Sequence, residues 1–117
     1  MRYVFFGTPE FAAIVLEKLI EAKIPPALVI TNPDRPFGRK KIITPPPVKQ
    51  LITESRLPIL ISQPEELGAI LPNLLSLNPD LFIVAAYAKK LTNETLQIPR
   101  LGVIGVHPSL LPKYRGP

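Results

Sequence analysis

Apolar residues in this chain alternate between two patterns: short continuous runs and stretches with helical spacing. Five short runs rich in β-branched and aromatic residues predict buried strands, and they span residues 2–6, 27–31, 57–62, 80–86 and 102–106. The stretch after the first run carries apolar residues at helical spacing instead: Phe11, Ala12, Val15, Leu16, Leu19 and Ile20. A strand, a helix and a further strand in succession predict a right-handed crossover and a parallel strand pair.

Three residues shape the turn between the first strand and its helix. Gly7 permits a tight turn, Thr8 is predicted to be the helix N-cap, and Pro9 suits the first helical position. The later glycines of the dinucleotide-binding fingerprint G-x-G-x-x-G are missing, which argues against an NAD site.

Further helices are predicted downstream. The Pro45-Pro46-Pro47 run starts a helix that carries Val48, Leu51 and Ile52 on one face. Residues 63–66 open a second helical stretch, in which Pro72 predicts a break near Leu71. Residues 93–98 form a short third one. The whole pattern predicts an α/β fold: a Rossmann-like open, mainly parallel sheet with helices on both faces.

The carboxyl edge of that sheet is where we expect the chemistry. In open parallel α/β sheets, ligands bind beyond the carboxyl ends of the strands. Tyr87 and His107 follow the fourth and fifth runs, so both are expected at that edge. His107 is the only histidine, and an imidazole there suits acid–base chemistry at neutral pH. The alternative is a packed or solvated histidine without a catalytic role.

Composition narrows the class of protein. There is no cysteine and one histidine, so disulfides, thiolate metal sites and a histidine-based zinc site are excluded, and we expect no metal. The longest apolar run, residues 81–88, is far shorter than the roughly 20 residues of a membrane span. We therefore expect a soluble cytoplasmic protein with no membrane partner.

Positive charge is concentrated in one segment. The net charge is +5, and residues 32–49 contain five basic residues against one acidic residue, Asp34. The basic residues are Arg35, Arg39, Lys40, Lys41 and Lys49. We interpret residues 32–41 as an extended basic loop. Composition alone favours a solvated loop, although the charge also permits an anionic partner such as nucleic acid.

The last residues carry the most specific motif. His107-Pro108-Ser109-Leu110-Leu111-Pro112 and the basic, glycine-containing residues after it resemble the folate-dependent formyltransferases, in which an Asn-x-His pair precedes Ser-Leu-Leu-Pro. This family moves a formyl group from 10-formyltetrahydrofolate, the expected cosubstrate, to an amine. The family's asparagine position is occupied by Gly105 here.

The resemblance implies roles for individual residues. His107 would be catalytic, and Gly105 would leave the site without one oxyanion donor. Ser109, Leu110, Leu111 and Pro112 would form the loop that contacts folate, together with the backbone at Tyr87 and Ala88. From the residues alone, Leu110 and Leu111 could equally anchor the loop in the core, and Tyr87 and Ala88 could form a plain surface turn.

Two other segments resemble the branch of the family that acts on methionyl-tRNA. They are residues 6–12 and the basic segment 32–49. The resemblance implies that Arg39, Lys40 and Lys41 contact the acceptor end of initiator methionyl-tRNA. An amino sugar is the alternative amine acceptor.

The resemblance extends from Phe6 to Gly116 and fixes the expected domain organisation. The chain stops before the family's catalytic aspartate, the remaining strands of its catalytic domain and its C-terminal β-barrel domain. We therefore expect residues 1–117 to be the N-terminal part of a catalytic domain, incomplete at its C-terminus, without the β-barrel domain and inactive alone. The other reading is a truncated, non-catalytic Rossmann-like fragment that binds folate or RNA. The sequence does not indicate an oligomeric state.

Overall fold

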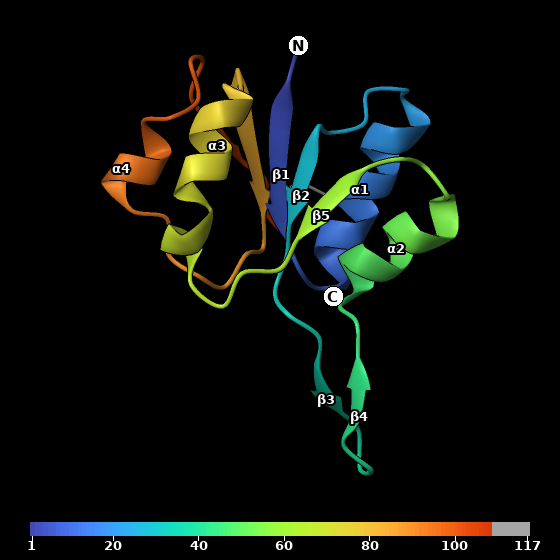
Figure 1. Cartoon of the computed structure of the whole chain (residues 1–117). Helices are drawn as coiled ribbons and strands as arrows, with labels where there is room; N and C mark the ends of the chain where they lie inside the picture. Colours follow the sequence, from blue (N-terminus) through green and yellow to red (C-terminus); the bar gives the residue numbers. More distant parts are fainter. Residues whose placement is uncertain (109–117) are drawn as a thin grey trace.

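The five apolar runs form one parallel sheet in a computed structural model that describes residues 1–108 (Figure 1). Its strands are β1 (Tyr3–Gly7), β2 (Leu28–Ile30), β5 (Leu60–Ser62), β6 (Leu81–Ala85) and β7 (Val103–Gly105). They lie in the order β5-β2-β1-β6-β7, and every neighbouring pair is parallel. The predicted α/β fold is confirmed.

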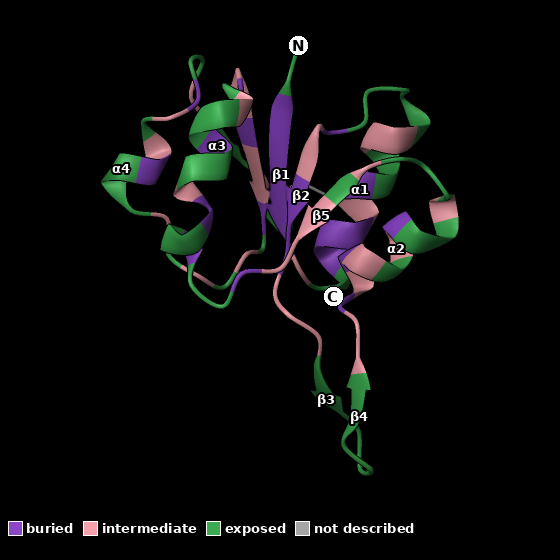
Figure 2. Ribbon diagram, viewed as in Figure 1, coloured by how far each residue is buried: buried purple, intermediate pink, exposed green. Residues whose placement is uncertain are grey.

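Alternating residues of β1 place the core on both faces of the sheet. Tyr3 and Phe5 belong to one buried cluster, which packs against α1 (Glu10–Glu21) and α2 (Pro47–Ser55). Val4 and Phe6 belong to a second cluster, which packs against the 3₁₀ helix η1 (Leu67–Ile70) and α3 (Leu71–Leu77). A strand buried on both faces is typical of a central parallel strand. All five residues of β1 are buried (Figure 2).

The start of α1 differs from the prediction. Pro9, not Thr8, is the N-cap, and the helix begins at Glu10. The Thr8 hydroxyl instead accepts a hydrogen bond from the backbone N–H of Asn32 at 3.2 Å and lies 3.3 Å from the Thr31 hydroxyl. Thr8 was therefore wrongly predicted as a cap, because its side chain ties the end of β1 to the end of β2.

Proline sets two of the other helix boundaries. Pro47 is the first residue of α2, as predicted, and Pro46 is its N-cap. The expected break near Leu71 is confirmed, since 3₁₀ geometry gives way to α-helix there. A short helix, α4 (Asn93–Leu96), is capped by the Thr92 hydroxyl, which accepts a hydrogen bond from the N–H of Thr95. No helix within residues 1–108 is long and apolar enough to cross a bilayer.

The basic segment is a β-hairpin rather than the predicted extended loop. Strands β3 (Arg35–Phe37) and β4 (Ile42–Thr44) pair antiparallel and project beyond the carboxyl edge of the main sheet (Figure 1). Gly38 and Lys41 have left-handed backbone conformations, with φ of 81° and 54°, which allow the chain to reverse. We call residues 35–44 the basic hairpin and residues 39–41 its tip.

Candidate functional site

The carboxyl edge of the sheet contains a topological switch point. The chain moves from β1 to β2 on one side and later returns to β6 on the other side of β1. The N–H of Thr8, just after β1, donates to the carbonyl of Ala86, just after β6, at 3.2 Å. Ala86 has a left-handed backbone with φ of 59°, so the chain turns sharply there. Crevices at such switch points are the usual ligand sites of open α/β sheets.

His107 lies at this edge, as predicted. Strand β7 pairs with β6 in parallel register, with Gly105 opposite Val84, so Tyr87 and His107 both follow strand ends on the same side. The His107 residue is exposed. Its imidazole is therefore accessible to a substrate at the carboxyl edge.

Gly105 occupies an open position. It is exposed, and no described atom lies within 4 Å of the place where a Cβ would stand. Its φ is not in the left-handed region, so an amino acid with a side chain fits its backbone. The glycine is therefore not required by the described structure.

Tyr87 is packed more deeply than a plain surface turn. Its ring contacts Phe6 edge-on, with ring centroids 5.6 Å apart, and burial raises the pKa of its phenol. The hydroxyl therefore stays protonated at neutral pH. Within the described residues, this hydroxyl and the side-chain oxygen of Asn32 are buried without a hydrogen-bond partner. Such atoms normally receive a partner from ordered water or a ligand. Ala88, the other residue expected beside folate, is exposed.

A cleft of about 390 Å³ opens between the end of β2, the start of α1, the base of the basic hairpin and the start of α2. Six prolines line it: Pro9, Pro33, Pro36, Pro45, Pro46 and Pro47. Proline fixes its own φ, so these walls are stiff. The rest of the lining includes the ring of Phe37, which is 74% exposed, and polar residues such as Asn32.

The tip of the basic hairpin carries its charge into solvent. Arg39, Lys40 and Lys41 are exposed, and none of them forms an ion pair with any residue of the described part of the chain. Arg35 and Lys49 differ, because Glu65 and Asp34 neutralise them at 3.4 Å and 3.2 Å. Three of the five basic residues in the segment are thus available to an anionic partner.

The structure brings the predicted residues to one edge but not to one point. Three strand spacings of about 4.8 Å separate the ends of β2 and β7, so the base of the basic hairpin and His107 lie on the order of 14 Å apart across the sheet. The predicted folate loop, Ser109, Leu110, Leu111 and Pro112, lies outside the described residues. Within residues 1–108, no group of three or more histidine, cysteine or acidic residues could hold a metal ion.

The proline-lined cleft was not predicted from the sequence. Its lining comes from residues 8–10, 32–37 and 44–50, which are separate in the sequence and meet only in the folded chain. The feature of the sequence that could have pointed to it is the high proline content, 16 of 117 residues, since six of those prolines line this one cleft.

Comparison with known proteins places the chain in a family. All of its residues, 1–117, match the formyl transferase family. The chain is 49% identical over 118 residues to a methionyl-tRNA formyltransferase of Halalkalibacterium halodurans. The matched region covers 99% of this chain and 37% of that protein. It is 51% identical over 115 residues to the enzyme of the same name from Lysinibacillus sphaericus, covering 97% of this chain and 36% of that protein.

The chain thus spans a little over a third of the length of the curated relatives that it matches. Its parallel sheet, flanked by helices on both faces, agrees with the sequence match along the whole chain. This protein chain belongs to the formyl transferase family.

Proposed function

We propose that residues 1–117 are the N-terminal part of the catalytic domain of an enzyme that transfers the formyl group of 10-formyltetrahydrofolate to the amino group of initiator methionyl-tRNA. One structural observation supports a nucleic-acid substrate in addition to membership of the family. An exposed basic hairpin and the strand end that bears His107 share the carboxyl edge of the sheet. The relatives that carry the name methionyl-tRNA formyltransferase support the choice of acceptor.

The reaction is an acyl transfer. The amine nitrogen bonds to the formyl carbon, the carbonyl becomes an oxyanion, and the bond between the formyl carbon and the folate nitrogen then breaks. The amine gives up a proton and the departing folate nitrogen gains one. We assign His107 to this proton movement, because histidine is the side chain that enzymes use most often for proton transfer and this residue is exposed. Residues 1–117 alone are not proposed to turn over substrate.

The formyl donor is proposed to bind at the switch point. Tyr87, Ala88, Ser109, Leu110, Leu111 and Pro112 would contact it. The close approach of the chain after β1 and after β6, with the sharp turn at Ala86, supports a ligand there, because ligands of open α/β sheets bind at such switch points.

The tip of the basic hairpin is proposed to contact phosphates of the tRNA acceptor end. Replacing Arg39 by alanine in the full-length protein should raise the KM for methionyl-tRNA and leave the affinity for folate unchanged. Binding measured between 50 and 300 mM salt should show a slope of log affinity against log salt that is smaller by about 1, as expected when one phosphate contact is lost.

Lys18→Ala is the matched control for Arg39→Ala. It removes the same charge from the last turn of α1, at the opposite edge of the sheet, where the Lys18 side chain is 74% exposed. Its tRNA affinity should stay close to that of the parent. Equal KM values and equal salt slopes for Arg39→Ala and the parent would refute the RNA contact.

A side chain at position 105 should be tolerated. Because the position is open among residues 1–108 and not left-handed, Gly105→Asn should not destabilise this part of the protein. An added amide could donate to the developing oxyanion, and one such donor contributes about 10²–10³ in rate where it is used. We expect turnover to rise or to stay close to that of the parent. A large loss of turnover at unchanged melting temperature would mean that the glycine itself is required.

A further inference from the structure

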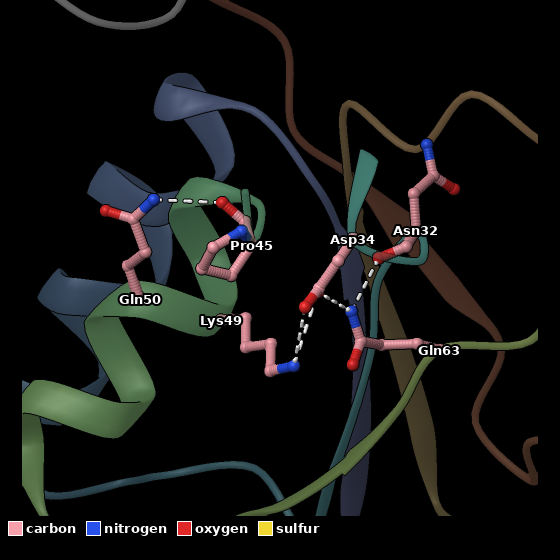
Figure 3. A network of polar contacts seen from close by, with 6 residues as sticks. All are labelled: Asn32, Asp34, Pro45, Lys49, Gln50 and Gln63. Carbon is pink, nitrogen blue, oxygen red and sulfur yellow. Dashed lines mark hydrogen bonds and ion pairs between the residues drawn. The ribbon is translucent and has the colours of Figure 1, made fainter. Parts of the chain in front are cut away.

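Hydrogen bonds run along the carboxyl edge of the sheet from one strand end to the next. The side-chain amide of Gln63, just after β5, donates to the carbonyl of Asn32, two residues beyond β2, at 3.0 Å (Figure 3). The N–H of Asn32 donates to the Thr8 hydroxyl at 3.2 Å, and the N–H of Thr8 donates to the carbonyl of Ala86 at 3.2 Å. The ends of β5, β2, β1 and β6 are therefore joined in a line. We call Gln63, Asn32, Thr8 and Ala86 the edge network.

The edge network belongs to the sheet and not to the basic hairpin. Gln63 also donates to the Asp34 carboxylate at 2.7 Å, where the chain leaves for the hairpin (Figure 3). None of the hydrogen bonds that define the network involves residues 35–44. The network therefore acts on the spacing of the strand ends, whatever direction the hairpin takes.

Thr8 is central to the edge network because its side chain continues the strand pairing. The backbone pairing of β1 with β2 ends at Phe6 and Ile30. Beyond that pair, the Thr8 hydroxyl accepts from the N–H of Asn32 and lies 3.3 Å from the hydroxyl of the buried Thr31. Thr8 and Asn32 also both line the proline-lined cleft, so their hydrogen bond joins two of its walls. Loss of this hydroxyl would free the end of β2 from the end of β1 and leave the backbone pairing intact.

The acceptor substrate has to cross these strand ends. In the proposed function it is held by the tip of the basic hairpin, on the β2 side, and reacts beside His107, on the β7 side. The strand order makes this a span on the order of 14 Å over the ends of β1 and β6. The amine and the formyl carbon react well only when they are held about 3–3.5 Å apart, and a misplacement of about 1 Å can cost about 10² in rate. The spacing of these strand ends therefore bears on turnover.

We propose that Thr8 is a positioning residue, whose hydroxyl fixes the end of β2 against the end of β1 and so sets the distance between the acceptor side of the edge and His107. The hydroxyl acts through the backbone of Asn32 and is not assigned to the reacting atoms. This inference rests on the proposed function, because it concerns where the acceptor stands relative to His107.

Two substitutions of Thr8 separate the hydroxyl from the rest of the side chain. Thr8→Val keeps the shape of the side chain and the N–H that binds Ala86 but loses the acceptor for Asn32, whereas Thr8→Ser keeps the hydroxyl. In the full-length protein, Thr8→Val should lower kcat for methionyl-tRNA by about three- to thirtyfold. The KM for both substrates should stay close to that of the parent, because phosphate contacts dominate RNA affinity and the backbone after β6 is unchanged. Thr8→Ser should have a kcat near that of the parent.

Ser55→Ala is the matched control for the lost hydrogen bond. The Ser55 hydroxyl also accepts a backbone N–H at 3.2 Å, that of Leu57, but it lies at the end of α2, one helix length from the carboxyl edge. Thr8→Val and Ser55→Ala should each lower the melting temperature by about 2–4 °C, as expected for one lost hydrogen bond. Only Thr8→Val should lower kcat.

Hydrogen exchange of the Asn32 amide reports on the contact itself. In Thr8→Val this amide loses its acceptor and should exchange about three- to tenfold faster than in the parent. In Thr8→Ser and Ser55→Ala its exchange should match that of the parent. Unchanged exchange in Thr8→Val would overturn the inference, because the hydroxyl would not be what holds Asn32.

The kinetic outcomes separate this inference from the proposed function. If Thr8→Val and Ser55→Ala have the same kcat while His107→Ala has lost activity, Thr8 has no positioning role and the proposed function stands. A loss of kcat in Thr8→Val that Thr8→Ser shares would also overturn the inference, since the hydroxyl would not be the cause. If the parent does not formylate methionyl-tRNA, the proposed function fails and the positioning role of Thr8 fails with it.

Discussion

Replacing His107 by alanine in the full-length protein should lower the turnover of formyl transfer by about 10²–10⁴-fold, the range contributed by a positioned general acid or base. His107 is the only histidine in the chain and follows the edge strand β7 at the carboxyl edge of the sheet. Because the residue is exposed, its removal creates no cavity, so the melting temperature should not change.

Turnover and binding must be measured separately for His107→Ala. Steady-state kinetics with saturating formyl donor should show a lower kcat at a nearly unchanged KM for methionyl-tRNA, because the imidazole acts on the reacting atoms and not on the RNA. A decrease in kcat of less than about threefold would fall well below the contribution of a general acid or base and would remove His107 from the mechanism.

The largest expected effect on stability is at Gly7, where β1 turns into α1. A Cβ placed there would lie 2.6 Å from the Cβ of Ala12 and 2.7 Å from the carbonyl oxygen of Ala85. Both distances are far below van der Waals contact, and the second neighbour is backbone of β6, which cannot rotate away. Gly7→Ala should therefore lower the free energy of unfolding by about 1–3 kcal/mol, the usual cost of overpacking a core.

Gly68→Ala is the matched control for Gly7→Ala. Within residues 1–108, no neighbouring atom lies within 4 Å of its Cβ position, and its backbone is not left-handed, so the substitution should be neutral or slightly stabilising. Urea unfolding of both variants and the parent measures the difference. Equal midpoints for Gly7→Ala and Gly68→Ala would show that α1 and β6 can move apart at the switch point, and that the close approach is not needed.

The sheet could be predicted from the sequence because its signals are local. Strands β1 and β6 are continuous apolar runs, and the apolar residues of α1 recur at helical spacing. The burial of each element can therefore be predicted from its own residues. Pro72 likewise marks a change of helix type within one turn of its position. Right-handed crossovers then leave few ways to order the strands.

The basic hairpin and the polar contacts at its base could not be predicted in this way. The hairpin has only three paired residues on each strand, and its apolar side chains face solvent, so no period of two points to a core. The contacts of Asp34 join residues 15 and 29 positions apart, and Thr8 finds its partner 24 positions away. Such pairings depend on the finished sheet. Thr8 was wrongly predicted as a helix cap for the same reason, because its actual partner is distant in the sequence.

The candidate site was partly predictable. The edge that bears Tyr87 and His107 follows from strand ends alone, and the structure confirms that these two residues share it. The roles of Gly105, Ser109, Leu110, Leu111 and Pro112 came from resemblance to the family and stay predictions. The buried hydroxyl of Tyr87 and the proline-lined cleft needed the three-dimensional structure, because their neighbours come from separate parts of the chain.

The most direct test of the proposed function compares amine acceptors in one assay. The full-length protein is incubated with 10-formyltetrahydrofolate and, in parallel, with methionyl-tRNA, glycinamide ribonucleotide or an amino-sugar nucleotide, and formylated product is quantified over time. We predict formylation of methionyl-tRNA with a far higher kcat/KM than either small acceptor, and loss of that activity in His107→Ala. Faster formylation of a small acceptor, or no formylation of methionyl-tRNA, would contradict the proposed function.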